Sequence, residues 1–264
     1  MNIPKKVCDR LSAAMKQMKP IIADQRTKDV SEADTVKLVI NLLEEVFGYD
    51  KYAEVTSEHA IRGSYCDLAI KINDKLKQLI EVKAIGISLE DRHVKQVVDY
   101  AANAGIEWVV LTNGIVWRLY YVVFKKPIDK QLIAEIDLTA IDCKNDAQQS
   151  LLFLFTKEGF TRDAQVEMRD LKDATSRYLL AALILKNDSV LDAIRRELRR
   201  VVKVNVDEAQ IAAVLSAQVI KRDALEGPEA EEAEKRIQRC SDHSIVTPHS
   251  ESEEAIKQAP PPQA

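Results

Sequence analysis

Glycine and cysteine are scarce in this chain of 264 residues, and each shortage excludes a class of protein. Only seven glycines are present, and neither a G-x-x-x-x-G-K nor a G-x-G-x-x-G string occurs. The sequence therefore argues against an NTPase motor and against a dinucleotide-binding domain. The four cysteines lie far apart and lack the C-x-x-C spacing of zinc sites, so we expect neither a zinc site nor a disulfide scaffold.

Long apolar runs and a signal peptide are also missing, so we expect no membrane span and a location in a reducing cytoplasm. Hydrophobic residues make up 46% of the chain and charged residues 30%, which allows a sizeable core. These fractions exclude the collagen-like and disordered classes. The length favours one large domain, with or without appendages.

The formal net charge of −4 is unevenly distributed. Residues 223–264 contain ten acidic and four basic residues, a net charge of −6, which leaves +2 for residues 1–222. The acidic balance is therefore a property of the C-terminal segment and does not argue against a polyanionic ligand. The small positive charge of the remainder predicts weak, salt-sensitive binding to nucleic acid.

Local patterns predict the secondary structure. Helices are expected over 4–19, ending near Pro20, over 31–47 with Ser31 as N-cap, and over 89–104 before Gly105. Strands are expected at 51–57, 64–72, 76–84, 107–112, 115–124 and 131–136, with a hairpin turn at Asn113-Gly114. Later helical segments are expected at 146–156, 162–185, 188–201 and 207–223. One more charged helix can follow Gly227, and the polar last 25 or so residues are expected to be disordered.

The hairpin over residues 64–84 contains the most informative residues. With the turn centred on Asp74, Asp67 lies directly opposite Glu81, and strand alternation places Lys83 on the same face. The opposite face is almost entirely apolar. A one-residue slip in register would move Asp67 to the wrong face.

Two carboxylates that face each other on a sheet repel and destabilise it, whereas a divalent cation bound by both makes the pair stabilising. Mg²⁺ binds one or two carboxylates and completes its shell with water and substrate phosphate. A nearby lysine can orient the attacking water or stabilise the charge of the transition state. The hairpin therefore predicts a metal-dependent phosphodiesterase site with Mg²⁺ or Mn²⁺, in which the Val82 carbonyl is a possible third ligand. The alternative is that Asp67, Glu81 and Lys83 are solvated residues of a half-exposed sheet.

The helix after this hairpin places polar residues on one face. Arg92, Gln96, Tyr100 and Asn103 follow helical spacing, while the valines and alanines between them suit packing against a sheet. Gln96 and Tyr100 can hold a phosphate or position the lysine by hydrogen bonds. An ordinary amphipathic helix explains the same pattern.

These residues together resemble the PD-(D/E)XK nuclease superfamily: Asp67, then Glu81-Val82-Lys83, then Gln96 and Tyr100 as Q-x-x-x-Y. More narrowly, four strings in order resemble the N-terminal nuclease domain of type I restriction enzyme R subunits, over roughly residues 30–125. They are SEADTVKLVINLLEEVFGYD, IEVKA, VKQVVDYA and VVLTNGIVWRLY.

The resemblance implies an α/β fold with a restriction-endonuclease-like mixed sheet core, ordered α-β-β-β-α-β, and a C-terminal helical extension. It implies Mg²⁺-dependent hydrolysis of DNA in restriction or phage defence. By resemblance, Asp67 and Glu81 bind the metal and Lys83 serves the attacking water, with Gln96 and Tyr100 in support. Glu32 matches an acid on the first helix that often joins the site, and it is equally well explained as a first-turn acid.

Two features depart from the family. Cys66 stands where the name-giving proline is found, in a position that varies. The chain also lacks the Walker motif of the helicase motor, so the resemblance implies a stand-alone nuclease-like protein. We expect residues 1–140 to form the nuclease domain, 141–227 a helical extension, and 228–264 an acidic, largely disordered tail.

The expected partners are DNA and other restriction or defence subunits, and a second copy of the chain is a further candidate. Two alternatives stay open. One is a non-catalytic nucleic-acid-binding or regulatory module, and the other is a structural adaptor whose helical region does the work.

Other candidate residues favour structural roles. The helix expected over 188–201 and the residues just after it carry a basic stripe: Arg195, Arg196, Arg199, Arg200 and Lys203. Such a stripe can contact successive phosphates of a nucleic acid. We favour the alternative, a solvated face in which these residues pair with Asp192 and Glu197. Trp108 and Trp117 can stack on bases but are expected in the core. The histidines lack metal-ligand spacing, and only His93 is near the predicted site: His59, His93, His243 and His249.

Overall fold

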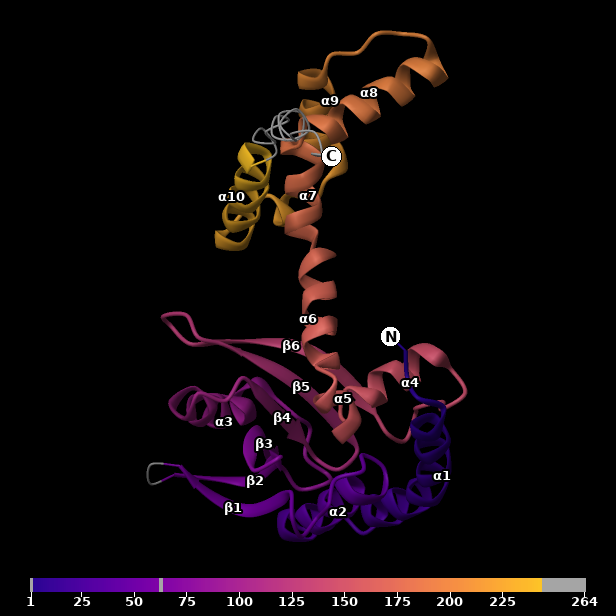
Figure 1. Cartoon of the computed structure of the whole chain (residues 1–264), viewed down its shortest axis with the longest axis vertical. Coiled ribbons are helices and arrows are strands. Elements are labelled where there is room, and N and C mark those ends of the chain that lie inside the picture. The colour runs from indigo at the N-terminus through magenta and orange to yellow at the C-terminus, as the bar shows by residue number, and fades with distance from the viewer. Residues whose placement is uncertain (1, 62–63, 244–264) are drawn as a thin grey trace, which may run out of the picture. The chain divides into compact units, whose positions relative to one another are not determined.

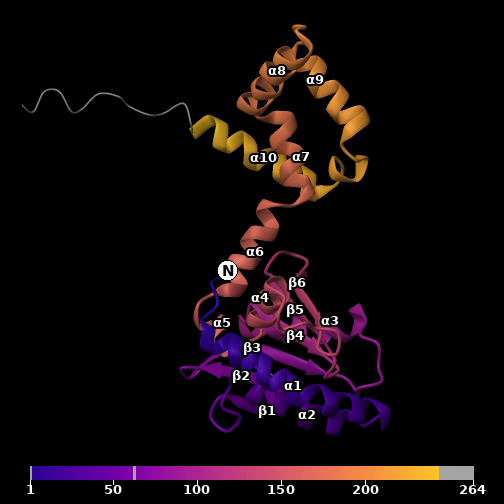
Figure 2. The same ribbon diagram turned by 90° about the vertical axis from the view of Figure 1, so that its right-hand side faces the viewer.

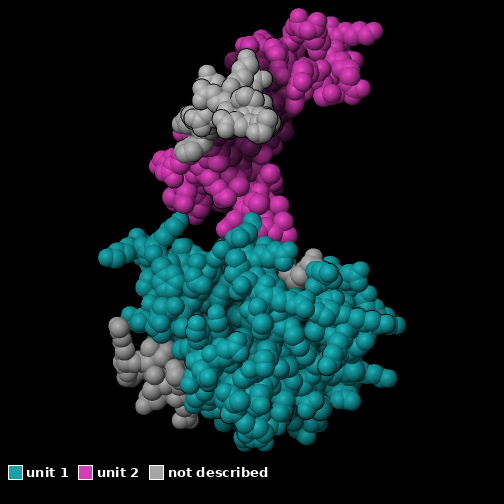
Figure 3. All heavy atoms as spheres, viewed as in Figure 1, with its two compact units in different colours: residues 1–170 teal, residues 171–264 magenta. Residues whose placement is uncertain are grey.

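The computed structural model describes residues 2–61 and 64–243, and only the backbone of residues 58–61, 64–65 and 241–243 (Figure 1). The chain forms two compact units, residues 1–170 and residues 171–264 (Figure 3). No helix in the described ranges is long and apolar enough to cross a membrane. The disorder expected at the C-terminus lies largely outside the described residues.

Two helices open the first unit. α1 spans Lys5–Thr27 and α2 spans Glu32–Glu45. The prediction that the first helix ends near Pro20 is wrong, because its buried stripe continues through that position to Ile22. The burial of this stripe outweighs the backbone hydrogen bond that proline removes. The prediction for Ser31 is confirmed, since its side chain accepts a hydrogen bond from the Asp34 amide.

A six-stranded mixed sheet forms the centre of this unit, with its strands in sequence order. The pairing of β3 with β4 is parallel and all other pairs are antiparallel. The bounds are β1 Val55–Ile61, β2 Ser64–Ile72, β3 Lys75–Val82, β4 Trp108–Thr112, β5 Val116–Val123 and β6 Asp129–Asp137. α3, Asp91–Ala104, connects β3 to β4 and ends at Gly105, whose φ of 70° suits glycine.

The predicted α/β fold with a mixed sheet and the order α-β-β-β-α-β is therefore confirmed. The first strand starts later than predicted. Residues 51–54 form a turn in which the Asp50 carboxylate accepts hydrogen bonds from the amides of Tyr52 and Ala53. Such a local side-chain interaction favours a turn over a strand.

Helices lie on both faces of the sheet (Figures 1 and 2), and buried apolar side chains fill the space between helices and sheet on each face. On one face, α1 and α2 pack with Ile80 and Val82 of β3. On the other face, α3 packs against Leu79 of β3 and Leu111 of β4. The alternative of solvated residues on a half-exposed sheet does not hold for Glu81, because α3 packs on the face that carries Glu81 and this residue is buried.

Short helices follow the sheet. α4, Asp146–Phe153, and α5, Lys157–Thr161, belong to the first unit. Leu152, Phe153 and Phe160 join its core, so the predicted domain boundary at residue 140 falls inside this compact unit. Arg10 of α1 forms a bidentate ion pair with Glu158 of α5, with N–O distances of 2.6 and 2.7 Å.

The remaining helices are α6 Ala164–Ala174, α7 Arg177–Lys186, α8 Asp188–Val202, α9 Glu208–Val214 and α10 Pro228–His243, with a π-helical turn at Leu215–Val219 and a 3₁₀ turn at Arg222–Ala224. The helix predicted over 162–185 is broken, because Ser176 caps α7 through the Leu179 amide. The helix predicted over 207–223 changes to π geometry after Val214. α10 is the charged helix expected after Gly227.

Candidate active site

The pairing of β2 with β3 places the two candidate carboxylates opposite each other. Leu68 pairs with Ile80 and Ala69 with Leu79, so Asp67 and Glu81 come next in the same register. The hairpin turn itself is tighter than expected. Asn73 and Asp74 both adopt positive φ, 51° and 60°, in a two-residue turn between Ile72 and Lys75.

A bulge compensates for the tight turn. The register shifts between Ile70 and Lys71, where Lys77 is the extra residue on β3. A two-residue turn with a one-residue bulge has the same effect at the far end of the hairpin as the predicted three-residue turn. The turn centre at Asp74 is therefore wrong, and the register predicted beyond the bulge is confirmed.

Direct contacts join Asp67 and Lys83 to the strand that carries Glu81. The Val82 amide donates a 2.7 Å hydrogen bond to Asp67 Oδ2. Lys83 Nζ donates to Glu81 Oε1 at 2.7 Å and lies 3.7 Å from Glu32 Oε2 of α2. The Glu81 side chain is only 8% exposed and that of Lys83 21%, whereas Glu32 is half-exposed. The structure thus brings four predicted residues into one charged cluster, which we call the acid–lysine cluster: Glu32, Asp67, Glu81 and Lys83.

The electrostatics of this cluster disfavour two negative charges. Burial raises the pKa of Asp67, the Val82 amide and Lys83 lower it, and the charge of Glu32 raises it again, for a net increase. Burial also raises the pKa of Glu81, and the nearby Asp67 charge adds to this, while Lys83 opposes it. The metal-free site therefore binds protons more readily than ordinary carboxylates do.

Lys83 stays a cation in this environment. Burial acts to lower its pKa, but the hydrogen bond with Glu81 and the charges of Glu81, Glu32 and Asp67 together raise it above the ordinary value. A lysine with a raised pKa is protonated at neutral pH. Its chemistry is therefore that of a hydrogen-bond donor and a positive charge, and not that of a general base.

Two residues that sequence reasoning missed fix the loop after β3. Thr35 of α2 is fully buried; its hydroxyl accepts from the Ile85 amide at 3.1 Å and donates to the Ser31 carbonyl at 2.9 Å. Asn113 donates to the carbonyls of Ile85 and Ile87. The position of Thr35 within the apolar stripe of α2 could have indicated its role. For Asn113, the Asn-Gly pair predicted only a turn.

Gln96 and Tyr100 form a separate pair. Gln96 Nε2 donates to the Tyr100 hydroxyl at 2.7 Å on the exposed side of α3. Within the described residues, no hydrogen bond or ion pair joins either of them to the acid–lysine cluster. The supporting role that the resemblance implies for these two residues stays a prediction.

His93 has a structural role at the start of α3. Its Nδ1 accepts a hydrogen bond from the Glu90 amide at 3.1 Å, in a capping box. The side chains of His59 and His243, and the whole of His249, lie outside what the structure describes. Trp108 and Trp117 are 7% and 1% exposed, which confirms that both belong to the core.

Three arginines of the basic stripe on α8 form ion pairs, mostly within their own helix, and Arg195 also lies 3.4 Å from Glu208 of α9. Arg195 and Arg196 both pair with Asp192, and Arg200 pairs with Glu197. The favoured prediction, a solvated face with internal ion pairs, is confirmed for these three arginines.

The donor set of the cluster suits a hard cation. Among the described residues, no group of three or more His, Cys, Asp and Glu side chains can hold one metal ion. A site here consequently depends on Asp67 and Glu81, and two carboxylates are within the number that Mg²⁺ uses beside water. Neither Asp67 Oδ1 nor Glu81 Oε2 receives a hydrogen bond from the described part of the chain, so each keeps an oxygen for a ligand.

The fold and the site together define a class of protein: a mixed α/β domain that carries two carboxylates and a lysine near the end of a central strand. Residues 32–138 match a family described as the type I restriction enzyme R protein N terminus. This segment contains every candidate site residue, and it resembles the N-terminal nuclease domain of those R proteins. Comparisons of the chain with curated proteins and with solved structures found no match.

Proposed function

We propose that this protein is a Mg²⁺-dependent endonuclease that hydrolyses DNA phosphodiester bonds in restriction or phage defence. The observation that supports this most is the partly buried pair Asp67 and Glu81, whose pKa values are both raised and which Lys83 alone does not neutralise. The match of residues 32–138 to the R protein N terminus supports a role related to restriction enzymes.

Asp67 and Glu81 would hold the metal, with the Val82 carbonyl as a further candidate ligand. Glu32, the other candidate, would have to move toward the pair to join, since no three acidic side chains of the described residues can hold one ion as they stand. When bound, Mg²⁺ stabilises negative charge on the phosphoryl oxygens and makes its water a better nucleophile. The Val82 amide fixes one oxygen of Asp67, which leaves the other oriented for binding. The same strand thus carries Glu81, the amide that positions Asp67, and Lys83.

Lys83 would act through its charge. Because its pKa is raised, the ammonium keeps its protons, orients the attacking water by donating a hydrogen bond, and stabilises charge on the scissile phosphate. With a cation held by Asp67 and Glu81, Lys83 would no longer be the main counter-charge of Glu81, and its ammonium could take this role. Gln96 and Tyr100 would support cleavage from α3, which covers the same face of the sheet.

The proposed partners follow from the same assignment. DNA is the substrate, and other restriction or defence subunits are candidate partners of the whole chain. A second copy is a further candidate, since two active sites would allow both strands of a duplex to be cut in one binding event.

A plasmid-cleavage time course with Mg²⁺ or Mn²⁺ tests the proposal. Asp67→Asn and Lys83→Met should each lower cleavage by about 10²-fold or more. Asp99→Asn, which neutralises an exposed carboxylate of α3, should not, and is the matched control. Cleavage that persists in EDTA or in both site variants would contradict the assignment, and so would a wild-type protein that is inert on every form of DNA.

A further inference from the structure

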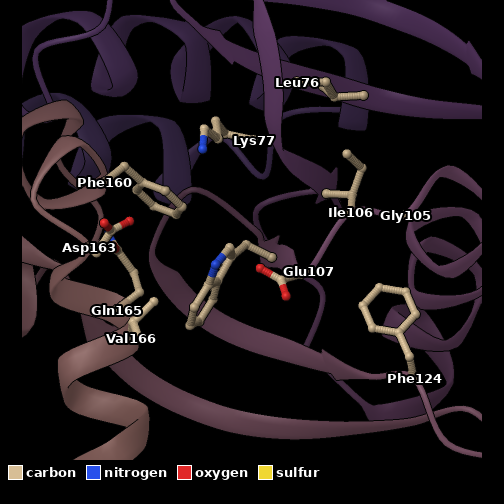
Figure 4. A pocket seen from close by; sticks show the side chains of 11 residues that line it. Leu76, Lys77, Gly105, Ile106, Glu107, Phe124, Phe160, Asp163, Gln165 and Val166 are labelled. Carbon is tan, nitrogen blue, oxygen red and sulfur yellow. The ribbon is translucent and has the colours of Figure 1, made fainter.

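A second site lies in the first unit, at the opposite end of β3 from Glu81. It is an open cavity of about 430 Å³ (Figure 4). Its walls come from the start of β3, the loop between α3 and β4, the end of β5, and the corner between α5 and α6. The candidate active site contributes none of the lining residues.

Three aromatic side chains belong to the lining of the cavity: Trp108, Phe124 and Phe160. Trp108 and Phe160 meet edge to face with their centroids 6.3 Å apart, and each is 7% exposed. Phe124, half-exposed, lines the side near Gly105 (Figure 4). A Cβ built on Gly105 would meet no atom within 4 Å, so the cavity stays wide at this glycine. Trp108 and Phe160 are therefore largely covered, and Phe124 is the ring of the three that is open for a flat ring to stack on.

Charged groups of both signs line the same cavity. Lys77, Glu107 and Asp163 contribute one positive and two negative charges. In the described part of the chain, no ion pair joins any of the three to another side chain; the Tyr121 hydroxyl donates a long, 3.5 Å hydrogen bond to Glu107. Lys77 is the extra residue of the β3 bulge, and bulges redirect side chains.

An aromatic wall, carboxylate acceptors and one ammonium match the parts of a nucleotide. Bases stack on aromatic side chains, and carboxylates accept hydrogen bonds from base amino groups. A lysine meets a phosphate as a point charge. The volume is within the range of small-molecule sites, which is about 300–1,000 Å³.

We propose that this cavity binds a nucleotide whose base carries an amino group. The base stacks on Phe124 beside Trp108, Glu107 and Asp163 accept hydrogen bonds from its amino group, and Lys77 contacts the phosphate. The nucleotide is either free or part of a nucleic-acid strand, because both present the same groups. The proposal is independent of the metal and of the acid–lysine cluster.

Tryptophan fluorescence of the full chain provides the test. The sequence has only two tryptophans, and Trp117 is buried in the core, so Trp117→Phe leaves Trp108 as the single reporter at the cavity. The protein is titrated in EDTA with AMP, GMP, CMP, UMP and a short single-stranded DNA. UMP is the matched control ligand, because its base has no amino group. Calorimetry on the unmutated chain repeats the titrations in case Trp117→Phe is poorly folded.

AMP, GMP or CMP should change the Trp108 emission and bind about tenfold more tightly than UMP. Glu107→Gln and Lys77→Met should each weaken this binding at least about fivefold. The matched controls Glu45→Gln and Lys75→Met, exposed residues outside the cavity, should not.

Tighter binding of the DNA strand than of any mononucleotide would assign the cavity to a strand, and the reverse would assign it to a free nucleotide. Absence of binding at millimolar nucleotide, equal binding of UMP, or binding that both cavity variants leave intact would each overturn the proposal. Asp67→Asn should bind nucleotide normally, which separates this result from any failure of the proposed nuclease activity.

Discussion

Replacement of Glu81 by glutamine should make the metal-free protein more stable. Folding raises the pKa of Glu81, because burial and the Asp67 charge outweigh the attraction of Lys83. The ionised form therefore destabilises the fold, and glutamine mimics the protonated form while it keeps a hydrogen-bond acceptor for Lys83. Facing like charges on a sheet cost up to about 1 kcal/mol. For a unit of this size, a gain of that order raises the Tm by about 2–4 °C.

The pH dependence follows from the sign of the shift. A raised carboxylate pKa means that the folded state binds the proton more tightly, so the stability of the wild type falls as the pH rises through the raised value. Below the ordinary value of 4.5 the wild-type carboxyl is neutral in both states, and the advantage of Glu81→Gln disappears. The difference in Tm between variant and wild type should thus narrow as the pH falls through the raised pKa of Glu81 toward its ordinary value of 4.5.

Metal should reverse the order of stability. At a Mg²⁺ concentration ten times its Kd, binding to the folded state stabilises the wild type by about 1.4 kcal/mol. The variant has lost one of two carboxylate ligands and should gain far less. Thermal unfolding by circular dichroism, with EDTA and with Mg²⁺, measures both effects. A variant less stable than the wild type in EDTA near neutral pH would refute this reasoning, because the cluster would then be a stabilising ion pair.

Three further substitutions test separate parts of the structure. Thr35→Val leaves the Ile85 amide without its buried acceptor and should cost about 1–3 kcal/mol, measured by urea unfolding; an unchanged midpoint would show that water replaces the hydroxyl. Gly114→Ala should lower the free energy of unfolding by about 1–2 kcal/mol, because φ is 80° there and the added Cβ would lie 3.2 Å from Leu38. Gly105→Ala is the control: its φ is also positive but the space around it is open, so it measures the backbone strain without the steric contact. Tyr100→Phe breaks only a hydrogen bond at the surface with Gln96, so its Tm should stay within about 1 °C while the cleavage rate falls; an unchanged rate would remove Tyr100 from the proposed site.

Sequence reasoning was most accurate where one local rule acts alone. Asn-Gly marked the turn between β4 and β5, Gly105 marked the end of α3, and Ser31 marked the start of α2. It failed at Pro20 because burial of the surrounding stripe is a tertiary effect that no local rule contains. The first strand was displaced because Asp50 captures the next amides in a turn.

The hairpin of the site shows why a register can be right when its turn is wrong. Alternation of apolar residues along β2 and β3 must match the two cores on either side of the sheet, and this constraint acts along the whole strand. Turn chemistry at Asn73-Asp74 acts only locally. The turn and the strand register differ by one residue, and the bulge at Lys77 accommodates this extra residue. The contacts of Lys83 with Glu32, and of Thr35 with Ile85, join segments about 50 residues apart and could not be read from spacing.

The same electrostatics bear on the choice between a nuclease and a non-catalytic module of the same fold. A module that only bound nucleic acid would gain nothing from two partly buried carboxylates, because each repels the phosphate backbone and burial raises the pKa of both. A single neutral substitution should remove that cost, as Glu81→Gln is expected to show. On the proposed function, a cation held by Asp67 and Glu81 would offset their repulsion, and two carboxylates beside a protonated lysine suit the hydrolysis of a phosphodiester. Stabilisation by Mg²⁺ that depends on Asp67 and Glu81, without any cleavage of DNA, would instead favour the module.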